Sequence, residues 1–182
     1  RTTSRQSASG FEHQMRFFFF FIDRIKTYCD LPIIIKGIAT KEDAILAVEH
    51  GVEVIYVSNH GGRQLDFGLG GLKVLPEIVD AVGKDATIFF DGGIMRGTDV
   101  IKALSLGADV VGIGRLQGLA AAAGGSKAIY RMLELLELEI VTCLRLLGVN
   151  DIVELNSTFL TKDVSLGSLD VLSAFPLINE GY

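Results

Sequence analysis

The sequence predicts an α/β fold made of repeated β/α units, and three observations lead to this class. After residue 30, short apolar runs alternate with longer amphipathic stretches that suit helices. The runs are apolar on both faces, as expected of parallel strands that helices cover. Each run is followed by polar or glycine-rich residues, and ligands bind at the carboxyl ends of parallel strands. We therefore expect four such ends to form one shared site.

The expected elements follow one another in the order of a β/α repeat. Four strands are predicted at residues 32–35, 54–57, 87–90 and 110–113. Helices are predicted at residues 41–50, 71–82, 97–106 and 126–147. Thr40, with Asp43 three positions later, resembles a helix-capping arrangement, and Gly51 and Gly107 stand where helix-ending glycines belong. A further short helix is expected around residues 151–155.

The number of strands indicates half of a larger barrel. A closed TIM (β/α)8 barrel needs eight strands and typically about 250 residues. This chain has 182 residues, and only four convincing strands. We therefore expect three parts: residues 1–30 as a separate segment with an aromatic helix, residues 31–160 as half a barrel, and residues 161–182 as a tail. The tail is expected to pack outside the barrel or across a subunit contact.

The run from Phe17 to Phe21 is the most unusual local feature of the chain. It is far shorter than the roughly 20 apolar residues that span a bilayer, so no transmembrane helix is expected. We expect the start of a packed helix there; an interface with another chain and a flexible segment are the alternatives. Residues 1–10 are polar, and we expect them to be mobile.

Composition narrows the classes of partner. The chain is 49% hydrophobic and 21% charged, which fits one compact domain with a substantial core. With 17 basic and 22 acidic residues, it lacks the basic surface of a nucleic-acid binder. Cys29 and Cys143 show no metal-ligand spacing, so we expect no metal site and a reducing, cytoplasmic location. The final residues show no recognisable peroxisomal signal, although a peroxisomal location stays open.

The residues after the first two strands combine a base with positive charges. Lys36 would place a fixed charge where it can stabilise a developing anion; an ordinary surface lysine is the alternative. His60 is expected to be a general base, because it precedes Gly61 and Gly62 at a strand end; a loop histidine bonded to backbone groups is the alternative. Arg63 can bind a carboxylate through two parallel hydrogen bonds.

The residues after the last two strands suit an anion. Asp91, Gly92 and Gly93 follow one strand, and Gly114 and Arg115 follow the next. Glycines expose backbone N–H groups and arginine adds charge, so the two loops predict a phosphate site. Such sites in barrels commonly lie after strands seven and eight, which makes the two earlier strands numbers five and six. Strands one to four would then be missing.

Four motifs in this order resemble one enzyme family. They are LPIIIKG, SNHGGRQLD, DGGIMRGTDV and GIGR. Together they resemble the FMN-dependent 2-hydroxy-acid oxidase and dehydrogenase family, which includes glycolate oxidase, lactate oxidase and flavocytochrome b2. The resemblance covers about residues 31–160 and corresponds to the carboxyl-terminal half of that family's barrel.

The resemblance implies oxidation of a small (S)-2-hydroxy acid to the 2-oxo acid, with FMN as cofactor. His60 matches the family's base, and Arg63 matches the residue that pairs with the substrate carboxylate. Lys36 matches the lysine beside flavin N1 and the C2 carbonyl. The other matching positions are expected to bind the cofactor: Ser58 and Asp91 at the flavin and its ribityl chain, Gly93, Gly114 and Arg115 at the phosphate, together with Gly92, Ile94 and Met95.

Two departures from the family pattern concern the phosphate. Met95 stands where the family usually has arginine, which removes one cationic contact, although its backbone is expected to contribute still. Leu116 stands where the family usually has proline. Two alternatives stay open: an FMN barrel with another oxidoreductase or isomerase reaction, and a noncatalytic half-barrel subunit, which these departures and the aromatic run suggest. A lone half-barrel would expose two strand edges, so we expect a second chain or segment with strands one to four, or a homo- or hetero-oligomer.

Overall fold

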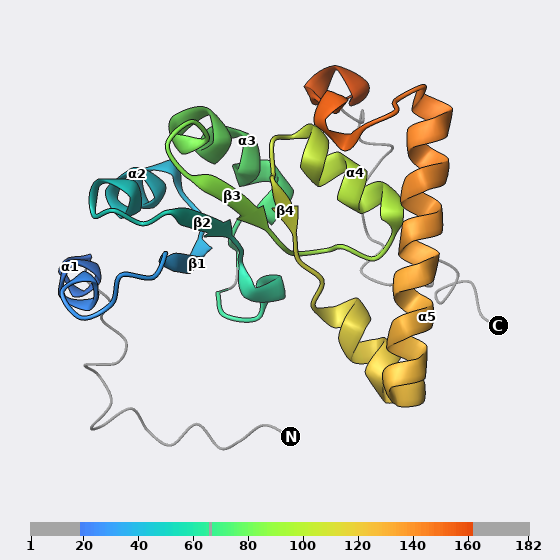
Figure 1. Cartoon of the computed structure of the whole chain (residues 1–182), viewed down its shortest axis with the longest axis horizontal. Helices are drawn as coiled ribbons and strands as arrows, with labels where there is room; N and C mark the ends of the chain where they lie inside the picture. The colour runs from blue at the N-terminus through green and yellow to red at the C-terminus, as the bar shows by residue number, and fades with distance from the viewer. Residues whose placement is uncertain (1–18, 66, 162–182) are drawn as a thin grey trace.

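A four-stranded parallel sheet forms the centre of the computed structural model, which describes residues 19–65 and 67–161 (Figure 1). The strands lie in the order in which they occur in the chain: β1 (Ile34–Ile38), β2 (Val54–Val57), β3 (Thr87–Phe90) and β4 (Val110–Val111). The α-helices are α1 (Phe20–Lys26), α2 (Lys41–Glu49), α3 (Gly71–Val82), α4 (Gly97–Ser105) and α5 (Arg115–Leu147). Three short 3-10 helices are η2 (His60–Gly62), η3 (Ile152–Glu154) and η4 (Ser157–Phe159). Sequential parallel strands with helices between them confirm the predicted class and match part of a barrel.

The two faces of the sheet differ in their cover. Helices α2 and α3 lie over one face, where side chains of β2 and β3 form the core with them (Figure 1). The core residues from these two strands are Ile55, Val57, Ile88 and Phe90. Side chains alternate between faces along a strand, so their neighbours point to the opposite side. There Ile34 is 52% exposed and Val110 is 42% exposed, and no helix of the described ranges covers them.

The predicted helix caps of the first units are present. The Thr40 side-chain oxygen accepts a hydrogen bond from the Asp43 backbone N–H at 3.2 Å, which satisfies one of the free donors at the start of α2. Gly51 and Gly107 follow α2 and α4 with φ angles of 77° and 96°. Only glycine adopts such angles without a steric cost, so both residues end their helices as expected.

The predicted first strand was misplaced by two residues. β1 begins at Ile34 instead of residue 32, because Pro32 has no N–H and the Ile33 N–H donates to the Glu53 side chain at 2.8 Å. The strand then continues through Lys36 to Ile38, with an irregular register between these two residues. Lys36 therefore lies within β1 and not behind it. The predicted fourth strand was too long, since β4 contains only Val110 and Val111.

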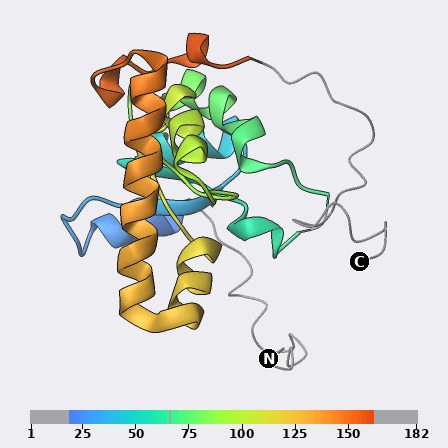
Figure 2. The ribbon, with the colours of Figure 1, turned by 90° about the vertical axis from the view of Figure 1, so that its right-hand side faces the viewer.

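Helix α5 begins earlier than the sequence predicted. It starts at Arg115 instead of residue 126, and the chain turns sharply at Gly124 and Gly125 between a short first segment and a long second one (Figure 2). Gly125 has a φ of 60°. Two adjacent glycines resemble a helix boundary in sequence, so the first segment was missed. The helix expected around residues 151–155 is the 3-10 turn η3.

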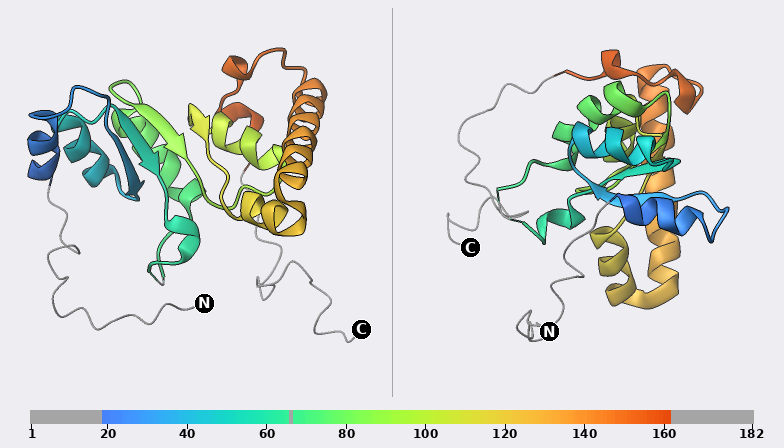
Figure 3. Two further views of the ribbon diagram at one scale, coloured as in Figure 1. Left: turned by 60° about the horizontal axis from the view of Figure 1, so that its bottom comes forward. Right: turned by 90° about the vertical axis from the view of Figure 1, so that its left-hand side faces the viewer.

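Helix α1 confirms a packed helix start in the aromatic run. Ile22 is only 1% exposed and belongs to the core. Figure 3 shows α1 beside α2, and two side-chain pairs hold it there. Lys26 lies 2.6 Å from Glu53, and Asp23 lies 2.8 Å from His50. The expectations for Phe17, residues 1–10 and residues 162–182 fall outside the described ranges. Within those ranges no helix is long and apolar enough to span a membrane.

Candidate functional site

The carboxyl ends of the four strands meet at one cleft of about 650 Å³. Ten of the eleven predicted site residues line it, and the eleventh, Ser58, is buried and only 2% exposed. Gln64 and Gly61 also line the cleft and were not among the predicted site residues. The lining residues from the prediction are Lys36, His60, Arg63, Asp91, Gly92, Gly93, Ile94, Met95, Gly114 and Arg115. The structure therefore brings the residues predicted at the four strand ends to one cleft.

Ser58 links the base to the charged pair on the neighbouring strands. Its hydroxyl accepts hydrogen bonds from the Lys36 Nζ at 3.0 Å and from the His60 backbone N–H at 3.1 Å. It donates its proton to Asp91 Oδ1. A hydroxyl has one proton and two lone pairs, so these three bonds use its full capacity. The Lys36 ammonium group also lies 2.9 Å from Asp91 Oδ2.

Tyr56 belongs to this network, although it was not among the predicted site residues. It pairs in register with Lys36, whose Nζ lies 4.9 Å from the centre of its ring. Burial raises the pKa of Tyr56, and the neighbouring Asp91 carboxylate raises it further. The phenol therefore stays neutral. Strand alternation could have identified Tyr56, since it lies two residues before Ser58 on the strand that leads into the site.

The loop that carries His60 has an unusual backbone. His60, Gly61 and Gly62 have consecutive positive φ angles of 55°, 70° and 71°. The predicted sharp turn at the two glycines is therefore confirmed. The Asn59 side chain holds the loop by accepting a hydrogen bond from the Gly62 N–H at 3.2 Å. The His60 ring and the Arg63 guanidinium make no hydrogen bond or ion pair with any described residue, so both can bind a ligand in the cleft.

The loops after β3 and β4 can hold an anion. An added Cβ at Gly93 or Gly114 would meet no atom within 4 Å, so both glycines border open space. The N–H groups of Gly93 and Ile94 have no partner among the described residues. Helix α5 starts at Arg115, and the free N–H groups of its first turn add a partial positive charge. The Arg115 guanidinium is held nearby by a 3.4 Å hydrogen bond to the Gly61 carbonyl.

The arginine next to Met95 is committed elsewhere. Arg96 donates two hydrogen bonds to Glu139 of α5, at 3.0 Å from Nε and 2.8 Å from Nη2. Glu139 also accepts the Gly97 N–H at 2.7 Å, at the start of α4. The hydrogen bonds from Arg96 lower the pKa of Glu139 and raise the pKa of Arg96. Arg96 therefore does not replace the cation missing at position 95. The Met95 N–H is also occupied, by Asp99 at 3.1 Å.

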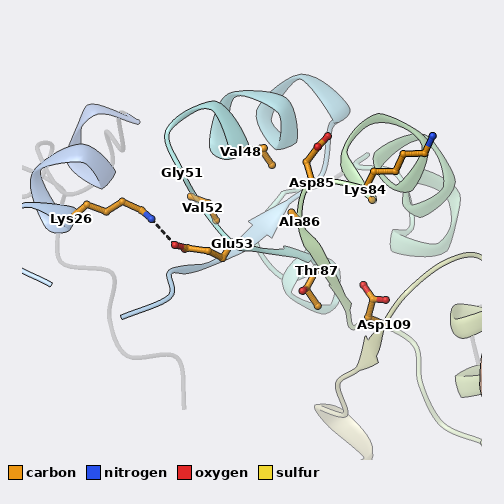
Figure 4. Close-up of a pocket in the computed structure, with 11 residues that line it drawn as sticks. Lys26, Val48, Gly51, Val52, Glu53, Lys84, Asp85, Ala86, Thr87 and Asp109 are labelled. Atoms are coloured by element: carbon orange, nitrogen blue, oxygen red, sulfur yellow. Dashed lines mark hydrogen bonds and ion pairs between the residues drawn. The ribbon is translucent and has the colours of Figure 1, made fainter. Parts of the chain in front are cut away.

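A second concavity lies at the amino ends of the strands and has a volume of about 740 Å³ (Figure 4). Two of the carboxylates that line it, Glu53 and Asp109, bond to other parts of the fold. Lys26 pairs with Glu53, and the hydrogen bonds from Lys26 and the Ile33 N–H lower the pKa of this carboxylate. Asp109 accepts the Ile88 backbone N–H at 2.7 Å. We therefore assign the chemistry to the carboxyl-end cleft. Among the described residues, no group of three potential metal-ligating side chains occurs.

Comparisons with known proteins agree with the geometry. The sequence profile of a family described as FMN-dependent dehydrogenase matches residues 2–162. An L-lactate oxidase from Nostoc sp. is 44% identical over 76% of this chain and 38% of its own length. A peroxisomal (S)-2-hydroxyacid oxidase from Arabidopsis thaliana is 45% identical over 70% of this chain and 35% of its own length.

Solved structures show the same fold. A crystal structure of lactate oxidase from Pediococcus acidilactici matches with a TM-score of 0.75 and 43% identity, over 78% of this chain and 40% of that one. A mandelate oxidase in complex with benzoyl-formic acid matches with a TM-score of 0.73 and 40% identity, over 76% of this chain and 41% of that one. The chain thus spans about 40% of the length of these two proteins.

Proposed function

The chain belongs to the FMN-dependent dehydrogenase family, and from this we propose that it forms the carboxyl-terminal half of an enzyme that oxidises a small (S)-2-hydroxy acid to the 2-oxo acid. One observation carries the proposal. A histidine and an arginine whose side chains make no hydrogen bond or ion pair to a described residue line the same cleft as a lysine and two glycine loops that can hold an anion. A base, a carboxylate clamp and a stabilising cation are the groups that this oxidation needs.

Each cleft residue then has a defined task. The Arg63 guanidinium binds the substrate carboxylate through two parallel hydrogen bonds and so orients C2. The His60 imidazole accepts one proton from the substrate as C2 is oxidised. FMN, when bound, would supply the acceptor for the two electrons that leave C2 and for the second proton that the alcohol loses. Lys36 places a positive charge where negative charge accumulates upon reduction, and Asp91 and Ser58 hold that charge in place.

The cleft residues suit both the phosphate and the flavin ring of FMN. The phosphate would lie at Gly93, Ile94, Gly114 and Arg115, where free N–H groups and a guanidinium offer hydrogen bonds to an anion. Gly92 and Met95 border this end of the cleft. Lys36, which lines the cleft, and the Ser58 hydroxyl bonded to it would hold the flavin. Any bond from Ser58 to the flavin must replace one of its three present partners, because its capacity is full.

We propose that strands one to four of a barrel cover the open face of the sheet. Ile34 and Val110 are exposed on this face, and Tyr56 and Phe89 are half-buried there. β1 and β4 each pair with only one strand of the described set, so both edges can accept another strand. The relatives contain more than twice the matched length, which provides enough chain for these strands. The covering part is the remainder of the same polypeptide or a second chain in a homo- or hetero-oligomer.

The cysteines support a reducing compartment, and we propose the cytoplasm. Cys29 and Cys143 are both free. A peroxisomal site is the alternative.

Anaerobic reduction tests the proposed function. The complete protein that carries this chain should purify with bound flavin, and glycolate, lactate or mandelate should bleach its visible absorbance. Replacing His60 with glutamine should slow bleaching by about 10²- to 10⁴-fold while the colour persists, because only the base is lost. The control is His50→Gln, since His50 pairs with Asp23 outside the cleft.

The outcomes separate the alternatives. A bound flavin that no hydroxy acid bleaches would favour an FMN barrel with another reaction. A protein that binds no flavin would favour a noncatalytic subunit. Bleaching at an unchanged rate in His60→Gln would show that His60 is not the base.

A further inference from the structure

We propose that Gly37 is a positioning residue that provides the seat for the His60 imidazole, which means the space beside the Gly37 backbone that the ring occupies. The proposal rests on the proposed function, in which His60 accepts the substrate proton. It concerns a residue on the neighbouring strand, which has no ionisable or polar side chain of its own. Its role lies in the space that a missing side chain leaves.

The geometry at Gly37 is tight on the histidine side. An added Cβ would lie 2.9 Å from His60 Cε1, closer than real Cβ contacts allow. The same Cβ would lie 3.7 Å from Nδ1 and 3.9 Å from Nε2. The ring therefore turns its nitrogen-bearing edge toward the backbone of Gly37, and no side chain other than hydrogen fits between them.

The backbone of β1 is shaped to make this seat. Gly37 has a φ of 106°, which residues with a Cβ rarely adopt. The register between β1 and β2 shifts between Lys36 and Ile38, so Gly37 forms the irregular position of the strand. Bulges next to active sites often change where a side chain points. Here the irregular residue is Gly37, which has no side chain. The ring of His60, which lies in the loop after β2, occupies the space beside it.

Other restraints on the ring are few. The His60 backbone is fixed through the hydrogen bond from its N–H to Ser58. Its imidazole, however, has no hydrogen bond with any described residue. The close approach of Gly37 to the ring is thus a restraint on this side chain that does not depend on hydrogen bonding. A methyl group at position 37 would push the ring toward the cleft and away from its present orientation.

A nuclear Overhauser measurement tests the seat in a protein whose Gly37 is unaltered. This chain contributes three histidines to the spectrum of selectively labelled histidine, and the ring resonance that disappears in His60→Gln is the one of interest. In the complete protein, with or without bound FMN, the His60 Hε1 proton should show a cross-peak to the Gly37 Hα protons. Absence of this cross-peak would overturn the proposal, and the result does not depend on whether Gly37→Ala folds.

Gly37→Ala tests the functional consequence. Its rate of flavin reduction at saturating hydroxy acid should fall by about 100-fold, because an ångström-scale misplacement of a catalytic group costs that much. The substrate KM should change by less than about threefold, since Arg63 is untouched. The His60 ring resonances should shift. An unchanged rate or unchanged ring resonances would overturn the proposal.

Gly148→Ala is the matched control for backbone strain. Gly148 has a φ of 72° at the end of α5, and an added Cβ there would meet nothing within 4 Å. Its rate should stay within about twofold of the unchanged protein. If the unchanged protein binds no flavin, or hydroxy acids do not bleach it, the proposed function fails, whereas the cross-peak still decides whether Gly37 seats His60.

Discussion

The Lys36 ammonium group lies 2.9 Å from the Asp91 carboxylate, and this pair connects β1 to the loop after β3 across the intervening strand β2. This ion pair holds the Lys36 ammonium group at the cleft by the carboxyl ends of the strands. It also connects strand β1 to the loop after β3, and both border the cleft. Because Ser58 bonds to both partners, the positions of three successive strand ends are coupled.

Lys36→Met should reduce the rate of flavin reduction by about 10²- to 10³-fold, because a fixed positive charge is lost where negative charge develops. Stopped-flow measurement of bleaching in the complete protein gives this rate. Lys84→Met removes an exposed lysine at the opposite end of the strands and serves as the control. Equal rates for the two variants would rule out an electrostatic role for Lys36.

Met95→Arg should tighten FMN binding by about tenfold, because it adds a charge-assisted hydrogen bond at the phosphate end of the cleft. Met95 is 42% exposed and borders both this cleft and an apolar groove shared with Leu116. Fluorescence titration of the apoprotein with FMN measures the change, which should shrink as salt increases. Leu146→Arg adds the same charge far along α5, and an equal gain there would show that net charge alone is responsible.

Acid should weaken the connection between α4 and α5. Bonding to Arg96 lowers the pKa of Glu139 in the folded protein. Its contribution to stability is therefore complete above the ordinary glutamate pKa and is lost as pH falls through the lower, folded-state value. Both side chains are partly exposed, so the effect should be small.

Thermal unfolding as a function of pH measures this contribution. Glu139→Gln should lower the melting temperature at neutral pH and reduce its fall in acid. Glu134→Gln breaks a pair within α5 itself and should leave the interhelical contribution intact. If both variants lose the same acid dependence, the effect is not specific to the α4–α5 connection.

Gly112→Ala should destabilise the fold by about 1–3 kcal/mol through overpacking. An added Cβ would lie 2.0 Å from the Tyr56 hydroxyl oxygen. The φ of Gly112 is not positive, so the backbone would tolerate alanine. Urea unfolding measures the cost, and the same substitution in a Tyr56→Phe background should cost clearly less. Equal costs in both backgrounds would place the clash elsewhere.

Local sequence patterns predicted the bounds of the two central strands, which helices cover on one face. β2 and β3 have their predicted bounds, because continuous apolar runs between polar loops mark such strands well. β1 was misplaced because its limits depend on Glu53, which is distant in sequence and binds the Ile33 N–H. The start of α5 was missed because a kinked helix and a helix boundary share the same pair of glycines.

The candidate site was predictable where the strand ends are polar. His60, Arg63 and Arg115 were found from loop chemistry and meet in one cleft. Tyr56 and Gly37 were not found, because their importance depends on pairing and packing between strands. Ser58 was assigned to the cofactor, but its burial and three hydrogen bonds appear only in three dimensions.

The agreement between strand order and chain order has a consequence for how the protein folds. Each strand pairs with the one before it, from Ile34 with Val54 to Phe90 with Val111, so every pairing joins segments that are close in sequence. Closing the loop of a single β/α unit costs less entropy than pairing strands from distant parts of the chain. The sheet can therefore grow one β/α unit at a time as the ribosome releases the chain, with each new strand finding its template already in place.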